Sequence, residues 1–250
     1  MFAPILAMLV GLAVGSFLNV VITRLPRQES VLRGRSRCPT CGVPLAWRDN
    51  LPLVSFVLLR GRCRACGTAI PWRYPLVEAL CGGLAAALWF KFPASPALLA
   101  YFPFTALLVA LSFLDLEHFL LPDCLTYPGL ALGLVLSLIL PHLSFRSALL
   151  GALLGGASFY LIAWVYHRLT GREGLGGGDV KLMALIGAYL GAPALPWVVL
   201  LGAFLGSVAG LALAAKHKQG ARTPIPFGPF LGAGALIYLF GQEFFLAWGP

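Results

Sequence analysis

Two aspartates lie at the ends of apolar stretches, where a membrane-spanning chain rarely keeps a charge. Asp115 ends the run 97–114, and Asp179 follows three glycines and begins the run 180–192. A carboxylate near membrane depth is energetically costly, so its presence there indicates a function. Two carboxylates at helix ends on one predicted face could share a proton, which is the chemistry of an aspartyl protease.

Asp179 and a third aspartate, Asp123, also have a simpler interpretation as helix caps, whereas Asp115 does not, because it ends its apolar run. Asp179 could cap the helix that follows it, but the glycines 176–178 favour the catalytic interpretation. They permit backbone conformations closed to other residues and leave room for an extended substrate. Asp123 follows a proline and precedes an apolar run, so we expect it to be an N-cap. Glu117 and His118 are expected to be solvated interface residues.

Four of the six cysteines form two CxxC pairs separated by 21 residues, and the pairs are Cys38–Cys41 and Cys63–Cys66. Two such pairs can supply the four thiolates of a tetrahedral structural zinc site. The alternative is two disulfides, which require an oxidising compartment. Because the polar segment around these cysteines is predicted to be cytoplasmic, we favour zinc. Cys81 and Cys124 stand singly in apolar runs and are expected to pack there.

The composition is that of an integral membrane protein. The 250 residues are 59% hydrophobic and 11% charged, against about 25% charged in soluble domains. Apolar runs long enough to cross about 30 Å of hydrocarbon recur along the chain. We expect an all-α membrane protein with about eight transmembrane helices, at residues 2–22, 75–92, 97–114, 124–141, 147–166, 180–192, 196–215 and 226–247.

The net charge of +9 is explained by topology. Ten of the 18 basic residues lie between Arg24 and Arg73. Six more flank the connections at 168–181 and 216–222, and if all three segments face the cytoplasm only Lys91 and Arg146 lie outside. This distribution follows the positive-inside rule and places both termini outside the cytoplasm. We therefore expect contact with membrane lipids and no binding of nucleic acid.

Five stretches of the chain together resemble the bacterial type IV prepilin peptidases, which are bifunctional leader peptidases and N-methyltransferases of the GxGD aspartyl protease group. The stretches are GSFLNVVITRLP at 15–26, the four-cysteine segment continuing into PWRYPLVEAL at 71–80, DLEHFLLPD at 115–123, GGGDVKLMA at 176–184 and PFGPF at 226–230. GxGD alone is a weak signal, but five motifs in order, spread over nearly the whole chain, are specific.

The resemblance implies that Asp115 and Asp179 are the catalytic pair and that Asp123 is not. It also implies prepilin and pseudopilin substrates, an inner-membrane location, and S-adenosylmethionine as the donor that methylates the new N-terminus. The implied domains are a first transmembrane helix (1–22), a cytoplasmic zinc-binding loop linked to methyl transfer (23–74) and a membrane peptidase bundle (75–250).

The site of the methyl donor is less clear from the sequence, because the chain has no glycine-rich nucleotide-binding signature. By position we expect the donor beside the cysteine loop, with Arg73 and Glu78 as candidate cofactor-binding residues and Asp49 and Asn50 nearby. Loop salt bridges or caps would explain the same residues. Two other functions fit less well: a proton-coupled transporter, which predicts internal repeats and broken helices, and a non-enzymatic membrane scaffold.

Overall fold

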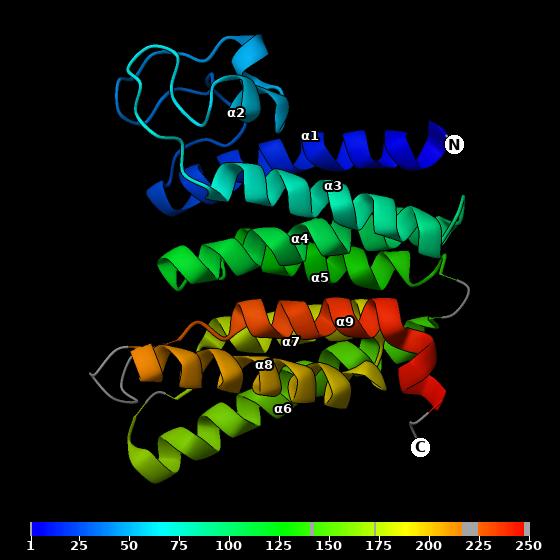
Figure 1. The fold of residues 1–250 in the computed structure, drawn as a ribbon. Coiled ribbons are helices and arrows are strands. Elements are labelled where there is room, and N and C mark those ends of the chain that lie inside the picture. The colour runs from blue at the N-terminus through cyan, green and yellow to red at the C-terminus, as the bar shows by residue number, and fades with distance from the viewer. Residues whose placement is uncertain (1, 141–142, 173, 217–224, 248–250) are drawn as a thin grey trace. The chain divides into compact units, whose positions relative to one another are not determined.

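A computed structural model describes residues 2–140, 143–172, 174–216 and 225–247, and these residues form helices and no extended strands (Figure 1). Two short 3-10 helices, η1 (Leu25–Arg27) and η2 (Trp47–Asn50), accompany the α-helices. The α-helices are α1 (Phe2–Arg24), α2 (Val54–Leu58), α3 (Arg73–Lys91), α4 (Pro96–His118), α5 (Asp123–Leu136), α6 (Phe145–Thr170), α7 (Gly177–Leu190), α8 (Ala194–Lys216) and α9 (Gly228–Ala247).

Every predicted apolar span coincides with a helix, but only five of these helices in the described residues are long and apolar enough to cross a membrane: α1, α4, α6, α8 and α9. The helices α5 and α7 have 14 residues each, which is about 21 Å of helix against a hydrocarbon core of about 30 Å. The predicted span 124–141 is shortened to residue 136, and residue 141 lies outside the described part. The all-helical membrane architecture is confirmed, whereas eight crossings stay a prediction.

The chain divides into two compact units, residues 1–110 and 111–250, with the division inside α4. These units are defined by internal contacts. The predicted segments 1–22, 23–74 and 75–250 rest on polarity and on the resemblance, and that division stays a prediction.

In the first unit, α1 and α3 pack side by side (Figure 1). Gly15 of α1 allows this approach, because a Cβ there would lie 2.7 Å from the Glu78 Cα and 2.9 Å from the Val77 carbonyl oxygen. Gly11 is equally close to the backbone of α3 at Cys81. The small residues at helical spacing are therefore packing residues, as small-xxx-small patterns in membrane helices usually are.

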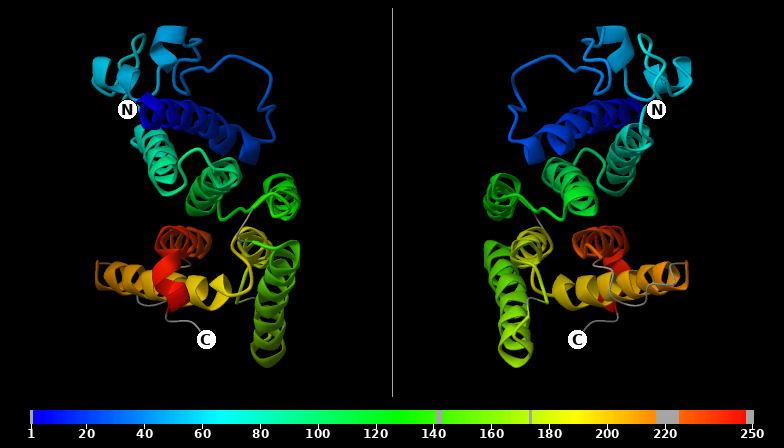
Figure 2. Two further views of the ribbon diagram at one scale, coloured as in Figure 1. Left: turned by 90° about the vertical axis from the view of Figure 1, so that its right-hand side faces the viewer. Right: turned by 90° about the vertical axis from the view of Figure 1, so that its left-hand side faces the viewer.

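In the second unit, α6 lies against α7 and α8 lies against α9 (Figure 2). Gly155 of α6 meets the backbone of α7, since a Cβ there would lie 2.6 Å from the Met183 carbonyl oxygen. The side chains of α7 from Leu185 to Leu190 are all buried. This short helix is therefore the centre of the unit, and its first turn carries Asp179.

Candidate active site and metal centre

Asp115 and Asp179 are both buried in the second unit, with 6% and 9% of their surface exposed. They are close enough for the charge of Asp115 to act on Asp179. Asp115 lies in the last turn of α4, which ends where Phe119 adopts a left-handed conformation (φ 52°) and donates its N–H to the Asp115 carbonyl oxygen. Asp179 is the third residue of α7. The structure thus brings together the two carboxylates that the sequence predicted as a pair.

Each carboxylate is held by the N–H of a glycine. The Gly228 N–H, at the first residue of α9, donates to Asp115 Oδ2 at 2.9 Å. The Asp179 carboxylate accepts a hydrogen bond from the Gly176 N–H. Gly228 is a site residue that our sequence reasoning missed, although its motif PFGPF had been noticed. The available signal was a glycine that lies between Pro226 and Pro229 at the start of an apolar run.

The three glycines before Asp179 act differently from our expectation. Gly176 is extended (φ −70°, ψ 142°) and caps α7, while Gly177 and Gly178 are helical, so none requires a conformation closed to other residues. Gly178 is needed for another reason: a Cβ there would lie 2.9 Å from the Leu121 Cβ. No atom lies within 4 Å of a Cβ at Gly177. Asp179 is also not the N-cap, so the capping alternative for it is wrong.

Our prediction that Asp123 is an N-cap is wrong. Pro122 is the N-cap of α5, and the cap has no side-chain hydrogen bond. The Asp123 carboxylate instead forms an ion pair with Lys181 of α7, and the Lys181 ammonium also lies over the Tyr127 ring. Glu117 and His118 are exposed at the end of α4, and the His118 Nε2 atom lies 3.8 Å from the Glu117 Oε2 atom.

The four paired cysteines of the first unit converge. Their sulfur atoms all lie within 4.8 Å of one another, and the Cys38 and Cys66 sulfurs are 3.8 Å apart. Sulfurs bound to one tetrahedral zinc at about 2.3 Å are separated by about 3.8 Å. All six cysteines are free thiols. The geometry therefore suits a single metal ion held by four thiolates.

The two CxxC pairs are structural copies of each other, a repeat that we did not find in the sequence. Isolated bridges join Arg37 to Pro44 and Arg62 to Ala69. Within each copy the first cysteine receives the N–H of the following glycine, Gly42 or Gly67, on its carbonyl oxygen at 2.9 Å. Both glycines have φ 72°, a left-handed conformation that favours glycine. The repeat RCxxCG at a spacing of 25 residues encodes these two knuckles.

The local electrostatics also suit a metal centre. Backbone N–H groups of Cys41 and Thr40 lower the pKa of Cys38, and hydrogen bonds from the Thr68 hydroxyl and backbone lower the pKa of Cys66 to about 6. At Cys41 the Val43 N–H favours the thiolate, but desolvation and the neighbouring thiols outweigh it and raise the pKa to about 11. Four thiolates so close together require a positive ion between them, and thiolates are the form that binds metal.

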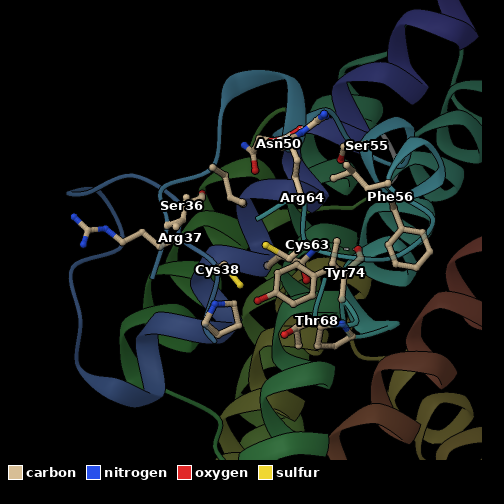
Figure 3. Close-up of a pocket in the computed structure, with 18 of the residues that line it drawn as sticks. Ser36, Arg37, Cys38, Asn50, Ser55, Phe56, Cys63, Arg64, Thr68 and Tyr74 are labelled. Carbon is tan, nitrogen blue, oxygen red and sulfur yellow. Dashed lines mark hydrogen bonds and ion pairs between the residues drawn. The ribbon is translucent and has the colours of Figure 1, made fainter. Parts of the chain in front are cut away.

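A cavity of about 420 Å³ lies between α1, the start of α3 and the cysteine loop (Figure 3). Glu78, Asp49 and Asn50 line it, as three of the four predicted donor-site candidates. Arg73 is not among the lining residues. Its guanidinium donates to the Thr23 hydroxyl at 2.7 Å and lies over the adjacent Tyr74 ring, so the structure does not place it with Glu78 in the cavity.

Comparison with known proteins covers both parts of the chain. The model of the bacterial peptidase A24 N-terminal domain matches residues 9–92, and the model of the type IV leader peptidase family matches residues 102–211. A protein of Burkholderia pseudomallei (strain 1026b), named prepilin leader peptidase/N-methyltransferase, is 41% identical over 97% of this chain and 87% of its own length. The chain belongs to the type IV leader peptidase family.

Other members of the type IV leader peptidase family are similarly close. Proteins with the same name from Myxococcus xanthus (strain DK1622) and Pseudomonas putida are 45% and 38% identical. The alignments cover 89% and 96% of this chain, and 68% and 91% of those proteins. No solved structure matches the chain significantly. The family model of residues 102–211 includes both aspartates, and the N-terminal model of residues 9–92 includes the cysteine cluster and the cavity.

Proposed function

We propose that this chain is a bifunctional membrane enzyme that removes the leader peptide of prepilins and pseudopilins and then N-methylates the new N-terminus. The observation that carries the peptidase half is the buried pair formed by Asp115 and Asp179. Relatives that align over most of the chain bear the name prepilin leader peptidase/N-methyltransferase. The proton-coupled transporter finds no support in these comparisons.

The two aspartates would act as one unit. Because two neighbouring carboxylates resist double ionisation, the pair holds one shared proton. The ionised carboxylate takes a proton from water, which attacks the peptide carbonyl carbon, and the protonated carboxylate donates to the developing oxyanion and later to the leaving amine. The titration belongs to the pair, so neither Asp115 nor Asp179 has a fixed role.

The glycine N–H groups would keep the pair in position. Gly228 and Gly176 each donate to one of the two carboxylates, which fixes the orientation of Asp115 and Asp179 without adding a side chain to the site. A substrate must be extended at the scissile bond, and the space beside Gly177 would accept its backbone. Proteolysis of this kind is proposed to need no metal.

The methyl transfer requires a donor of the S-adenosylmethionine type, which supplies an activated methyl group bound to a positive sulfur. The residues of this chain would bind the donor and bring the new N-terminal amine to it. The cysteine cluster would hold a structural zinc ion, through Cys38, Cys41, Cys63 and Cys66. We propose this role because a polar loop with few buried apolar side chains gains folding energy from a metal.

The chain is a multi-pass membrane protein, and we further propose that it lies in the bacterial inner membrane. In this topology α1 and α3 to α9 all cross or enter the bilayer, the cysteine loop and the aspartates face the cytoplasm, and both termini face the other side. The distribution of basic residues supports this orientation. Labelling of single cysteines placed at Lys91 and Arg168 tests it, because these two positions should react from opposite sides of the membrane.

The decisive experiment is cleavage of a purified prepilin in detergent. Asp115→Asn and Asp179→Asn preserve shape but remove the shared proton, so each should reduce the cleavage rate by at least a hundredfold. Asp123→Asn is the matched control, since this third aspartate is exposed and paired with Lys181. Folded Asp115→Asn or Asp179→Asn protein with more than a few per cent of wild-type cleavage would refute the proposed pair. Mass spectrometry of the product records cleavage and methylation separately.

A further inference from the structure

The cavity of the first unit has features of a small-molecule site. Its volume of about 420 Å³ lies within the range of about 300–1,000 Å³ that is usual for ligand pockets. Apolar and aromatic side chains form much of the wall, including Phe56, Tyr74, Leu45 and Ile70. Figure 3 shows the labelled Phe56 and Tyr74 rings together with Cys38 and Cys63, which come from the two knuckles. The metal centre therefore forms part of this wall.

The base of the cavity holds a carboxylate without a cation. Glu78 is 9% exposed, and its Oε2 accepts the Leu53 N–H at 2.8 Å. A further hydrogen bond comes from Ser16. Within the described ranges no basic side chain forms an ion pair with Glu78. Buried carboxylates are usually paired or bound to a cation, so this one is suited to a cationic ligand.

The other charged side chains that line the cavity already have hydrogen-bond partners or extend away from it. Asp49 is bound by the Arg64 guanidinium, with N···O distances of 2.7 and 3.0 Å. Arg24 donates to loop carbonyl oxygens, among them that of Arg33 at 2.8 Å. In Figure 3 the Arg37 side chain extends away from the other labelled residues. Glu78 is therefore the charged side chain of the cavity wall that a ligand would contact.

A second polar group in the wall also lacks a partner. Asn19 is 3% exposed and lines the cavity. Its Nδ2 donates to the Tyr74 carbonyl oxygen at 3.0 Å, which fixes the orientation of the amide. Its Oδ1 is buried without a hydrogen-bond partner among the described residues. A buried acceptor without a partner destabilises the folded state, and a ligand with N–H or O–H donors would satisfy it.

We infer that this cavity is the binding site of the S-adenosylmethionine-type donor, with the Glu78 carboxylate facing its positive charge and Asn19 Oδ1 accepting from one of its donor groups. The donor is a cation with a flat aromatic base and several N–H and O–H groups, which matches the carboxylate, the aromatic wall and the vacant acceptor. The inference rests on the proposed methyltransferase function, and it replaces Arg73 by Asn19 as the residue that accompanies Glu78.

Equilibrium binding of radiolabelled S-adenosylmethionine to the purified protein in detergent tests the site. Glu78→Gln keeps the shape of the side chain and removes its charge, so the affinity should fall at least tenfold. Glu29→Gln is the matched control, because Glu29 is exposed and does not line the cavity, and it should bind within twofold of wild type. Ultraviolet cross-linking of the bound donor should label the peptides that contain Phe56 or Tyr74.

A second variant protects the test against misfolding, since Glu78 also holds the backbone at Leu53. Ala46→Trp places an indole in the cavity from an exposed position and should weaken binding at least tenfold. Metal content and thermal melting verify that both variants are folded. Wild-type affinity in folded Glu78→Gln and Ala46→Trp proteins would overturn the assignment of the cavity. A wild-type protein that neither binds the donor nor methylates a cleaved pilin would instead refute the proposed methyltransferase function.

Discussion

Gly228 leaves no room for a side chain beside the Asp115 carboxylate. In Gly228→Ala, the added Cβ would lie 2.7 Å from Oδ2 and 3.3 Å from Cγ of Asp115. The carboxylate or the start of α9 must therefore move by about 0.7 Å to reach the ordinary contact distance of 3.4 Å. The same movement lengthens the hydrogen bond of 2.9 Å from the Gly228 N–H. The substitution should thus displace one member of the pair while leaving both carboxylates in the chain.

The expected loss follows from the sensitivity of catalysis to position. A misplacement of about 1 Å can reduce a rate by about a hundredfold, so we expect Gly228→Ala to cleave a prepilin roughly 10 to 100 times more slowly. This loss corresponds to about 1.4–2.7 kcal/mol of transition-state stabilisation. The assay measures the cleavage rate at saturating prepilin in detergent, with thermal melting of the same samples to show that the bundle is folded.

Gly83→Ala provides the matched control, because no atom lies within 4 Å of a Cβ at Gly83 in α3. It makes the same chemical change in a helix and should keep the wild-type cleavage rate. Folded Gly228→Ala protein that cleaves within twofold of wild type would refute the reasoning, since the carboxylate would then not depend on the N–H at the start of α9.

Three further outcomes are expected. Asp123→Asn should lower the free energy of unfolding by less than about 1 kcal/mol, because the ion pair between Asp123 and Lys181 is exposed. The cleavage rate of this variant should stay within threefold of wild type. A loss as deep as that of Asp115→Asn would identify Asp123 as a catalytic group. Gly178→Ala should reduce the cleavage rate, because the added Cβ forces α7 and Leu121 apart. Gly177→Ala places its Cβ in open space and should melt at the wild-type temperature. Equal melting temperatures and equal cleavage rates for the two variants would contradict the packing argument. Metal analysis should find one zinc ion per chain, and chelation should remove methylation before cleavage; protein without zinc, or with two disulfides, would exclude the metal centre.

Local features of the sequence predicted much of the fold and of the candidate site. Apolar runs located the helices because burial in lipid requires continuous hydrophobicity. The CxxC spacing identified the four converging thiols. The C-terminal ends of α5 and α7 were predicted at residues 141 and 192 but lie at Leu136 and Leu190, because composition does not show where backbone hydrogen bonding stops. At Gly191 the chain leaves α7 with φ 79°, yet the sequence around it remains apolar.

The errors concern partners that are distant in the sequence. Asp123 was predicted to cap α5, but its partner Lys181 lies 58 residues away. Gly228 was overlooked because Asp115 lies 113 residues away. No local pattern contains these pairs. The RCxxCG repeat was different, since it is visible in the sequence; it was missed because two copies of six residues are too short to resemble a repeat architecture.

The duplicated knuckles have a consequence for how the first unit assembles. Each knuckle is closed by hydrogen bonds within a ten-residue stretch, such as Leu45 N–H to Ser36 O and Ile70 N–H to Gly61 O, so each half can form as soon as its own segment is synthesised. An ion captured by the first knuckle would then recruit the second across 21 intervening residues. Closing a loop of that length costs about 3 kcal/mol, far less than the roughly 10–16 kcal/mol that a structural zinc ion can supply. With the proposed ion bound, the two knuckles would therefore join without help from the later membrane helices.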